Sequence, residues 1–68
     1  MQPGGYIMKE VRYNEILKTL ESQEVVKVTD LASQLNVTDM TIRRDLQELE
    51  EDGLLIRTHG GARSIPSH

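Results

Sequence analysis

VTDMTIRRDLQELE, residues 37–50, has the pattern of one amphipathic helix with an apolar side and a polar side. Its apolar residues recur at i, i+4 and i+7 and must face a core: Ile42, Leu46 and Leu49. Thr38 is a good N-cap, because its hydroxyl can accept a hydrogen bond from a first-turn backbone N–H. Asp39 suits the positive end of the helix dipole. The stretch therefore predicts a helix that begins after Thr38.

The opposite side of this helix has the chemistry to enter the major groove of DNA. At about 100° per residue it presents two cations, an amide and a thioether: Met40, Arg43, Arg44 and Gln47. Arginine can donate two hydrogen bonds to guanine O6 and N7, and a glutamine amide can pair with adenine N6 and N7. We therefore expect this helix to carry the function.

The segment before it predicts a helix-turn-helix. Thr29 is expected to cap a short helix that contains Leu31, Ala32 and Leu35. Asn36 can adopt the left-handed conformation of a tight turn, after which the longer helix begins. A short helix, a turn of about three residues and a longer helix form the helix-turn-helix arrangement. The alternative is an ordinary helical hairpin, which has the same spacing.

An earlier helix is predicted over residues 10–22, from apolar residues at i, i+3, i+4 and i+7: Tyr13, Ile16, Leu17 and Leu20. Its charged residues are interpreted as a solvated face with no other role: Lys9, Glu10, Arg12, Glu15, Lys18 and Glu21. Residues 24–28 are rich in β-branched valine and alternate near their end, so they favour a brief strand.

The residues after the long helix predict a β-hairpin wing. Gly53 suits the left-handed position after a helix, residues 54–58 favour a strand, and residues 62–65 favour its partner. Between them, Gly60 and Gly61 permit close backbone approach. The cations around this turn suit phosphate contacts: Arg57, His59 and Arg63.

Each candidate DNA contact also has an ordinary interpretation. Surface ion pairs at helical spacing are the alternative for Arg43 and Arg44, with three acids in reach: Asp39, Glu48 and Glu51. Met40 suits a thymine methyl group or solvent, and Thr41 suits a phosphate or solvent. Asp45 is expected to orient neighbouring side chains or to cap a neighbour. The position of the arginines opposite the apolar stripe favours DNA contact for at least one of them.

Composition excludes several classes of function. The chain has 68 residues, no cysteine and a net charge of −3, with two tyrosines as its only aromatic residues. We therefore expect no disulfide, no metal site at His59, no cofactor and no aromatic platform for single strands. A chain this small cannot build a pocket with paired carboxylates, so we expect no enzyme. The acid excess motivates one alternative, a winged-helix protein–protein interaction module without DNA specificity.

The chain resembles the N-terminal domain of the DeoR family of bacterial transcriptional regulators over about residues 10–64. The matching motifs are VTDLA at 28–32, LNVT at 35–38, TIRRDL at 41–46 and HGGA at 59–62. The resemblance implies a mainly α (α+β) winged helix-turn-helix with three helices and a small β-hairpin wing. Residues 38–44 would lead a recognition helix into the major groove, and the glycine turn would lie over the DNA backbone.

The resemblance also implies partners and boundaries. The domain would span residues 9–64 and bind double-stranded operator DNA in the cytoplasm, at the bacterial nucleoid, to repress sugar or sugar-phosphate catabolism genes. Residues 1–8 are expected to be a disordered lead or residues left from expression, with Met8 as an alternative start. Residues 65–68 would begin a linker to an absent C-terminal domain that binds a sugar phosphate and drives oligomerisation. This fragment alone is expected to be a monomer without membrane contact.

Overall fold

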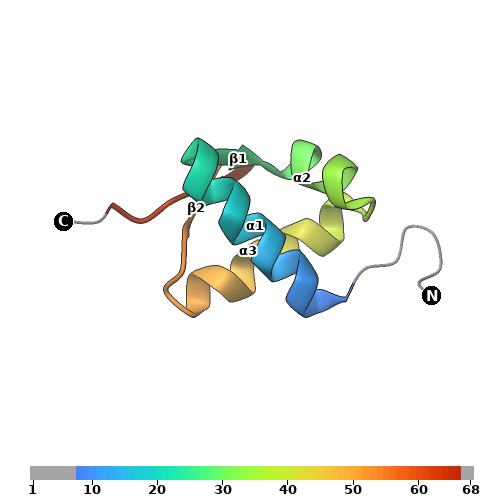
Figure 1. The fold of residues 1–68 in the computed structure, drawn as a ribbon, viewed down its shortest axis with the longest axis horizontal. Helices are drawn as coiled ribbons and strands as arrows, with labels where there is room; N and C mark the ends of the chain where they lie inside the picture. The colour runs from blue at the N-terminus through green and yellow to red at the C-terminus, as the bar shows by residue number, and fades with distance from the viewer. Residues whose placement is uncertain (1–7, 67–68) are drawn as a thin grey trace.

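The computed structural model describes residues 8–66, which form three helices and three short strands (Figure 1). In chain order these are α1 (Lys9–Gln23), β1 (Val25–Lys27), α2 (Val28–Leu35), α3 (Asp39–Glu51), β2 (Ile56–Thr58) and β3 (Gly61–Arg63). This is the predicted winged helix-turn-helix, with α2 and α3 as the helix-turn-helix pair. The interpretations of residues 1–7 as a disordered lead and of residues 67–68 as linker fall outside the described residues.

The turn between α2 and α3 is closed by local hydrogen bonds, as predicted. Asn36 is left-handed, with φ 58° and ψ 46°. Its N–H donates to the Ser33 carbonyl at 3.3 Å, and the next N–H, of Val37, donates to the Ala32 carbonyl at 3.0 Å. These two bonds satisfy carbonyls that the end of a helix leaves without partners. Thr38 then caps α3, because its Oγ1 accepts the Thr41 N–H at 3.1 Å.

The start of α2 differs from the prediction, because Thr29 is not its cap. Lys27 occupies the N-cap position without a side-chain hydrogen bond, so β1 runs directly into the helix. The Val28 N–H donates instead to the Gly60 carbonyl in the wing turn, at 2.9 Å. A first-turn amide of α2 is thus satisfied from another part of the chain, which removes the need for a side-chain cap there.

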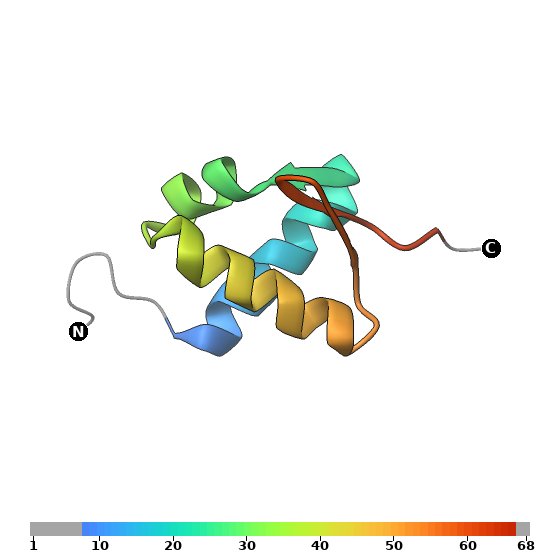
Figure 2. The ribbon, with the colours of Figure 1, turned by 180° about the vertical axis from the view of Figure 1, so that it is seen from behind.

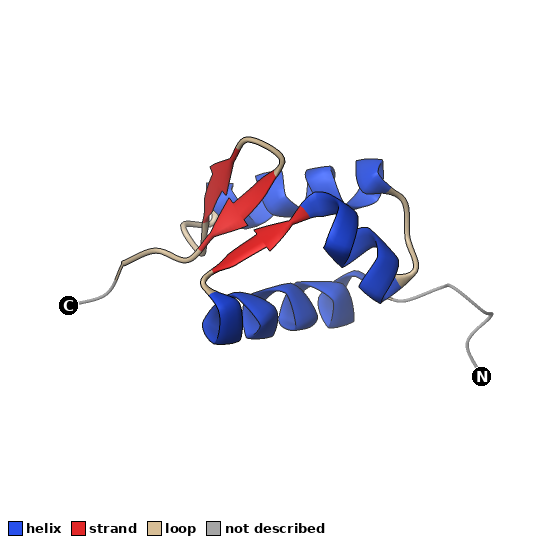
Figure 3. Ribbon diagram, turned by 90° about the horizontal axis from the view of Figure 1, so that it is seen from above, coloured by secondary structure: helices blue, strands red, loops and turns tan. Residues whose placement is uncertain are grey.

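The wing is part of a three-stranded antiparallel sheet in the order β1-β3-β2, and not an isolated hairpin (Figure 3). The register places Ala62 between Val26 on β1 and Arg57 on β2.

The strand predicted over residues 54–58 is shorter in the structure, because the turn that follows α3 occupies its first residues. Gly53 is left-handed with φ 77°, and the Leu54 N–H donates back to the Leu49 carbonyl at 2.9 Å. Gly61, expected in the turn, is the first residue of β3.

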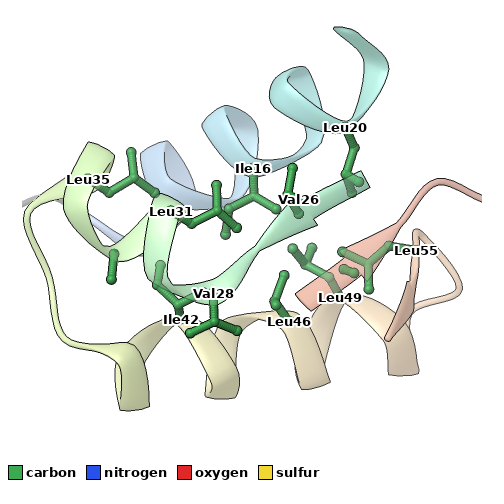
Figure 4. Close-up of a cluster of buried hydrophobic side chains, with 12 residues drawn as sticks. Ile16, Leu20, Val26, Val28, Leu31, Leu35, Ile42, Leu46, Leu49 and Leu55 are labelled. Atoms are coloured by element: carbon green, nitrogen blue, oxygen red, sulfur yellow. The ribbon is translucent and has the colours of Figure 1, made fainter. Parts of the chain in front are cut away.

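One core lies between the helices and the sheet (Figure 4). α3 contributes its predicted apolar stripe, which is at most 1% exposed, and the figure shows these side chains pointing from one side of the helix toward the other elements. The buried apolar residues are Ile16, Leu20, Val26, Val28, Leu31, Ala32, Leu35, Ile42, Leu46, Leu49, Leu55 and Ala62. Seen from behind, α3 runs along the domain and the chain rises from its C-terminal end into the wing (Figure 2).

Candidate nucleic-acid interface

The outward side of α3 carries the predicted contact residues. Met40 is 67% exposed, and Arg43, Arg44 and Gln47 are also exposed. At the start of the helix Thr38 is exposed, whereas Asp39 and Thr41 are half-buried. The rotation of α3 therefore agrees with the pattern in the sequence, since the apolar stripe is buried and the long polar side chains point to solvent.

The two arginines of α3 lie outside the ion pairs of the domain. Within residues 8–66, neither Arg43 nor Arg44 forms an ion pair, although the charge of Arg44 helps to lower the pKa of Glu48. Two acids that were the alternative partners are engaged elsewhere: Glu51 accepts the Gln47 amide at 3.4 Å, and Glu48 accepts from α1. Both guanidinium groups thus keep their donors for an external acceptor.

The wing meets α3 beside Arg43. A small hollow between the two is lined by Val28, Arg43, Leu46, Arg57, Thr58, Gly60 and Gly61. Arg57 lies opposite Ala62 in the sheet, so both side chains are on the same face as the buried Val26. One arginine of the helix and one of the wing are thereby brought to the same concave surface.

Two predicted wing contacts lie elsewhere. Arg63 is paired with Val25 and Ile56 on the other face of the sheet, and it lines a separate depression with Glu24 and neighbouring residues. Gly61 is buried, and a Cβ placed on it would lie 1.9 Å from the Val26 carbonyl oxygen. Its close backbone approach is therefore to β1. His59 and Gly60 remain exposed at the wing turn, where Gly60 has φ 81°.

The charged face of α1 has a role that the sequence interpretation missed. Arg12 donates to the buried carboxylate of Asp45 through Nε at 2.5 Å and through Nη2 at 3.0 Å. The hydrogen bond to Asp45 raises the pKa of the Arg12 guanidinium. The interpretation of these charges as only solvated was wrong for Arg12. The available signal was Asp45 itself, an acid three residues after Ile42 and thus on the apolar side of α3.

A second contact joins the same two helices one turn further along. The Tyr13 hydroxyl donates to Glu48, and the Lys9 ammonium lies 2.9 Å from the same carboxylate. These two donors, Tyr13 first, hold the pKa of Glu48 below its usual value. Burial, followed by the bond to Glu48, raises the pKa of the Tyr13 phenol. α1 therefore neutralises two acids of α3.

Residues 8–66 contain neither a metal-ligand cluster nor a membrane-spanning helix. No group of three or more His, Cys, Asp or Glu side chains there is placed to hold a metal ion. None of the helices in this range is long and apolar enough to cross a membrane.

Comparison with known proteins gives one family and a set of named relatives. Residues 12–68 match the family described as the DeoR-like helix-turn-helix domain. The lactose phosphotransferase system repressor of Streptococcus mutans is 52% identical over 56 residues, covering 82% of this chain and 22% of that protein. The protein of the same name from Lactococcus lactis is 44% identical over 59 residues, covering 87% of this chain and 23% of that protein. The chain thus spans about a fifth of the length of the curated relatives it matches. No solved structure matches the chain.

Proposed function

Because the chain belongs to the DeoR-like helix-turn-helix family, we propose that it binds double-stranded DNA sequence-specifically as the DNA-binding module of a repressor of sugar or sugar-phosphate metabolism. The observation that carries this proposal is the pair of exposed arginines on α3, which lie away from its buried stripe and form no ion pair within residues 8–66. A helix with this arrangement can enter the major groove with guanidinium groups facing the base edges.

In this proposal the N-terminal half of α3 contacts the bases and the wing contacts the backbone. The proposed residues on α3 and at its cap are Thr38, Asp39, Met40, Thr41, Arg43, Arg44 and Gln47. On the wing, Arg57, His59 and the exposed Gly60 backbone suit phosphate contacts. Arg63 and Gly61 lie off this surface, so the proposal does not include them.

The net charge of −3 is compatible with DNA binding because the charges are unevenly distributed. Four acids gather at the C-terminal end of α3, namely Glu48, Glu50, Glu51 and the C-cap residue Asp52, whereas Arg43 and Arg44 precede them. Arg57 also donates its backbone N–H to the Glu50 carboxylate at 3.1 Å, which holds this acid beside the strand. Because the excess of acids repels phosphate, we expect weak affinity for the isolated domain. We also expect strong dependence on salt, because salt screens interactions between exposed charges.

The relatives extend the proposal to a longer protein. They are named as repressors of the lactose phosphotransferase system, and we propose that a phosphorylated sugar acts on this protein through a larger C-terminal domain. One recognition helix contacts only a half-site, so two copies are needed for a two-fold operator. We propose that pairing comes from segments outside residues 8–66 and that the present domain alone is monomeric. We also propose that it acts in the cytoplasm and without catalysis. The comparisons lend no support to the alternative, a protein-interaction module without DNA specificity.

Selection of bound duplexes from a random pool tests the proposal and supplies the operator sequence. We expect the wild-type domain to enrich a defined motif. Arg43→Ala and Arg44→Ala should then lose discrimination at one or more positions, by ~1–3 kcal/mol for each bidentate contact with a base. Arg63→Ala is the matched control, because it removes an exposed arginine from the other face of the sheet. The proposal fails if no motif is enriched, or if both α3 variants select the wild-type motif unchanged.

A further inference from the structure

Asp45 is a carboxylate in the middle of an apolar stripe. It is 2% exposed and lies on the same side of α3 as Ile42 and Leu49. The residues that neighbour it at helical spacing are Thr41, Ile42, Glu48 and Leu49, and none of them is a cation. A buried carboxylate needs a partner, and α3 does not supply one at this spacing.

The partner comes from α1 and has a fixed geometry. Arg12 approaches Asp45 with two nitrogens on two oxygens, at 2.5 and 3.0 Å, and the two side chains are only 14% and 3% exposed. Such a two-bond contact is planar, so it constrains direction as well as distance. The apolar contacts of the core are non-directional by comparison. The Arg12–Asp45 pair therefore restricts rotation of α3 about its own axis more sharply than the leucines around it do.

This rotation decides where the outward side chains lie. With side-chain tips about 6 Å from the helix axis, a rotation of 10° moves each tip by about 1 Å, which exceeds the tolerance of a well-formed binding site. Arg43 and Arg44 immediately precede Asp45 on α3, so the contact with α1 fixes the helix close to these two arginines. A buried ion pair is weak evidence for added stability, because apolar residues of similar size often stabilise as well. Its geometric constraint is a separate effect.

We infer that Arg12 is a positioning residue for DNA recognition: through Asp45 it sets the rotation of α3 and so the register of Arg43 and Arg44 on the bases. This inference rests on the proposed function and adds to it a residue on a helix with no proposed DNA contact.

The double variant Arg12→Met/Asp45→Leu separates positioning from stability. It removes one cation and one anion, so the net charge and non-specific attraction to phosphate stay the same. It should melt no lower than wild type, because it replaces a buried ion pair with an apolar pair. The quantity to measure is the ratio of affinities for the duplex selected by wild type and for a random-sequence duplex of equal length. We expect this ratio to fall roughly tenfold, a loss within the range of one bidentate base contact, with binding to the random duplex unchanged.

Two further variants complete the test. Arg12→Lys keeps the charge but cannot form the planar contact, so it should also lower the ratio, and it carries the test if the double variant does not melt cooperatively. Leu20→Val weakens the packing of α1 while leaving the ion pair intact, and it should keep the wild-type ratio. An unchanged ratio in the folded double variant, or in Arg12→Lys, overturns the inference while leaving the proposed function in place. A wild-type ratio near one would instead overturn the proposed function itself.

Discussion

Substitution of Gly61 by alanine should disrupt the sheet although it adds only one methyl group. A Cβ at this position would lie 1.9 Å from the Val26 carbonyl oxygen, 3.0 Å from its carbonyl carbon and 3.1 Å from the Lys27 Cα. All three atoms belong to the backbone of β1, so no side chain can rotate away. To accept the methyl group, β1 and β3 must separate by more than an ångström.

The cost follows from what this separation breaks. The paired segment spans Val25–Lys27 and Gly61–Arg63, and each lost backbone hydrogen bond costs ~0.5–1.5 kcal/mol. Overpacking of the methyl group against the β1 backbone adds ~1–3 kcal/mol. We therefore expect a loss of about 3 kcal/mol or more. For a domain of this size that lowers Tm by at least ~12 °C.

Gly60→Ala is the matched control, because it adds the same methyl group one residue earlier. Among residues 8–66, no atom beyond its chain neighbours lies within 4 Å of its Cβ position, but its φ is +81°. Only the strain of the left-handed conformation therefore applies, ~1–2 kcal/mol. Thermal unfolding followed by circular dichroism measures both variants. If Gly61→Ala melts within about 2 °C of wild type, or above Gly60→Ala, the close approach of β3 to β1 is not what requires glycine.

Three further outcomes are expected. Ile42→Ala should cost ~2–5 kcal/mol because it opens a cavity in the core, and a urea titration showing a smaller loss would mean that the neighbours refill the space. Thr38→Ala should cost ~0.5–2 kcal/mol of stability through loss of the α3 cap. Thr29→Ala should stay within ~0.5 kcal/mol of wild type, because Thr29 is not the N-cap residue of α2 in the structure. Equal losses for these two variants in the same titration would contradict the assignment of the cap. The pKa of Glu48 is lowered by Tyr13 and Lys9, so its stabilising contribution is present above its ordinary pKa of 4.5 and is lost as pH falls through the lowered value. Glu48→Gln should therefore lose less stability between pH 7 and pH 3 than wild type does, and an identical loss would exclude Glu48 from acid unfolding.

The elements that depend on local chemistry could be predicted from the sequence. The rotation of α3, its cap at Thr38 and the left-handed turn at Asn36 each follow from residues within one or two helical turns. The order of three helices and a hairpin follows from the same periodicities.

The features that the sequence did not yield depend on residues far apart in the chain. A three-residue strand has too few positions to show alternation, so nothing in Val25–Lys27 identifies β3 as its partner. The start of α2 was misplaced for the same reason, because its first amide bonds to Gly60 across the fold. The contact between Arg12 and Asp45 joins residues 33 positions apart. In the candidate interface, the exposed residues of α3 could be predicted from helical periodicity. The face of the sheet on which Arg57 or Arg63 lies could not, because it depends on how the strands pair.

The direct passage from β1 into α2, without a loop, has a consequence for the encounter with a duplex. Strand β3 of the wing is the central strand of the sheet and is bonded to β1, and the next residue after β1 already belongs to the helix pair. Helices and wing therefore form one preassembled shape, which loses little conformational freedom on association. A rigid template of this kind leaves the adjustment of groove width to the nucleic acid, so sequences that bend easily gain an advantage even at base pairs that no side chain touches.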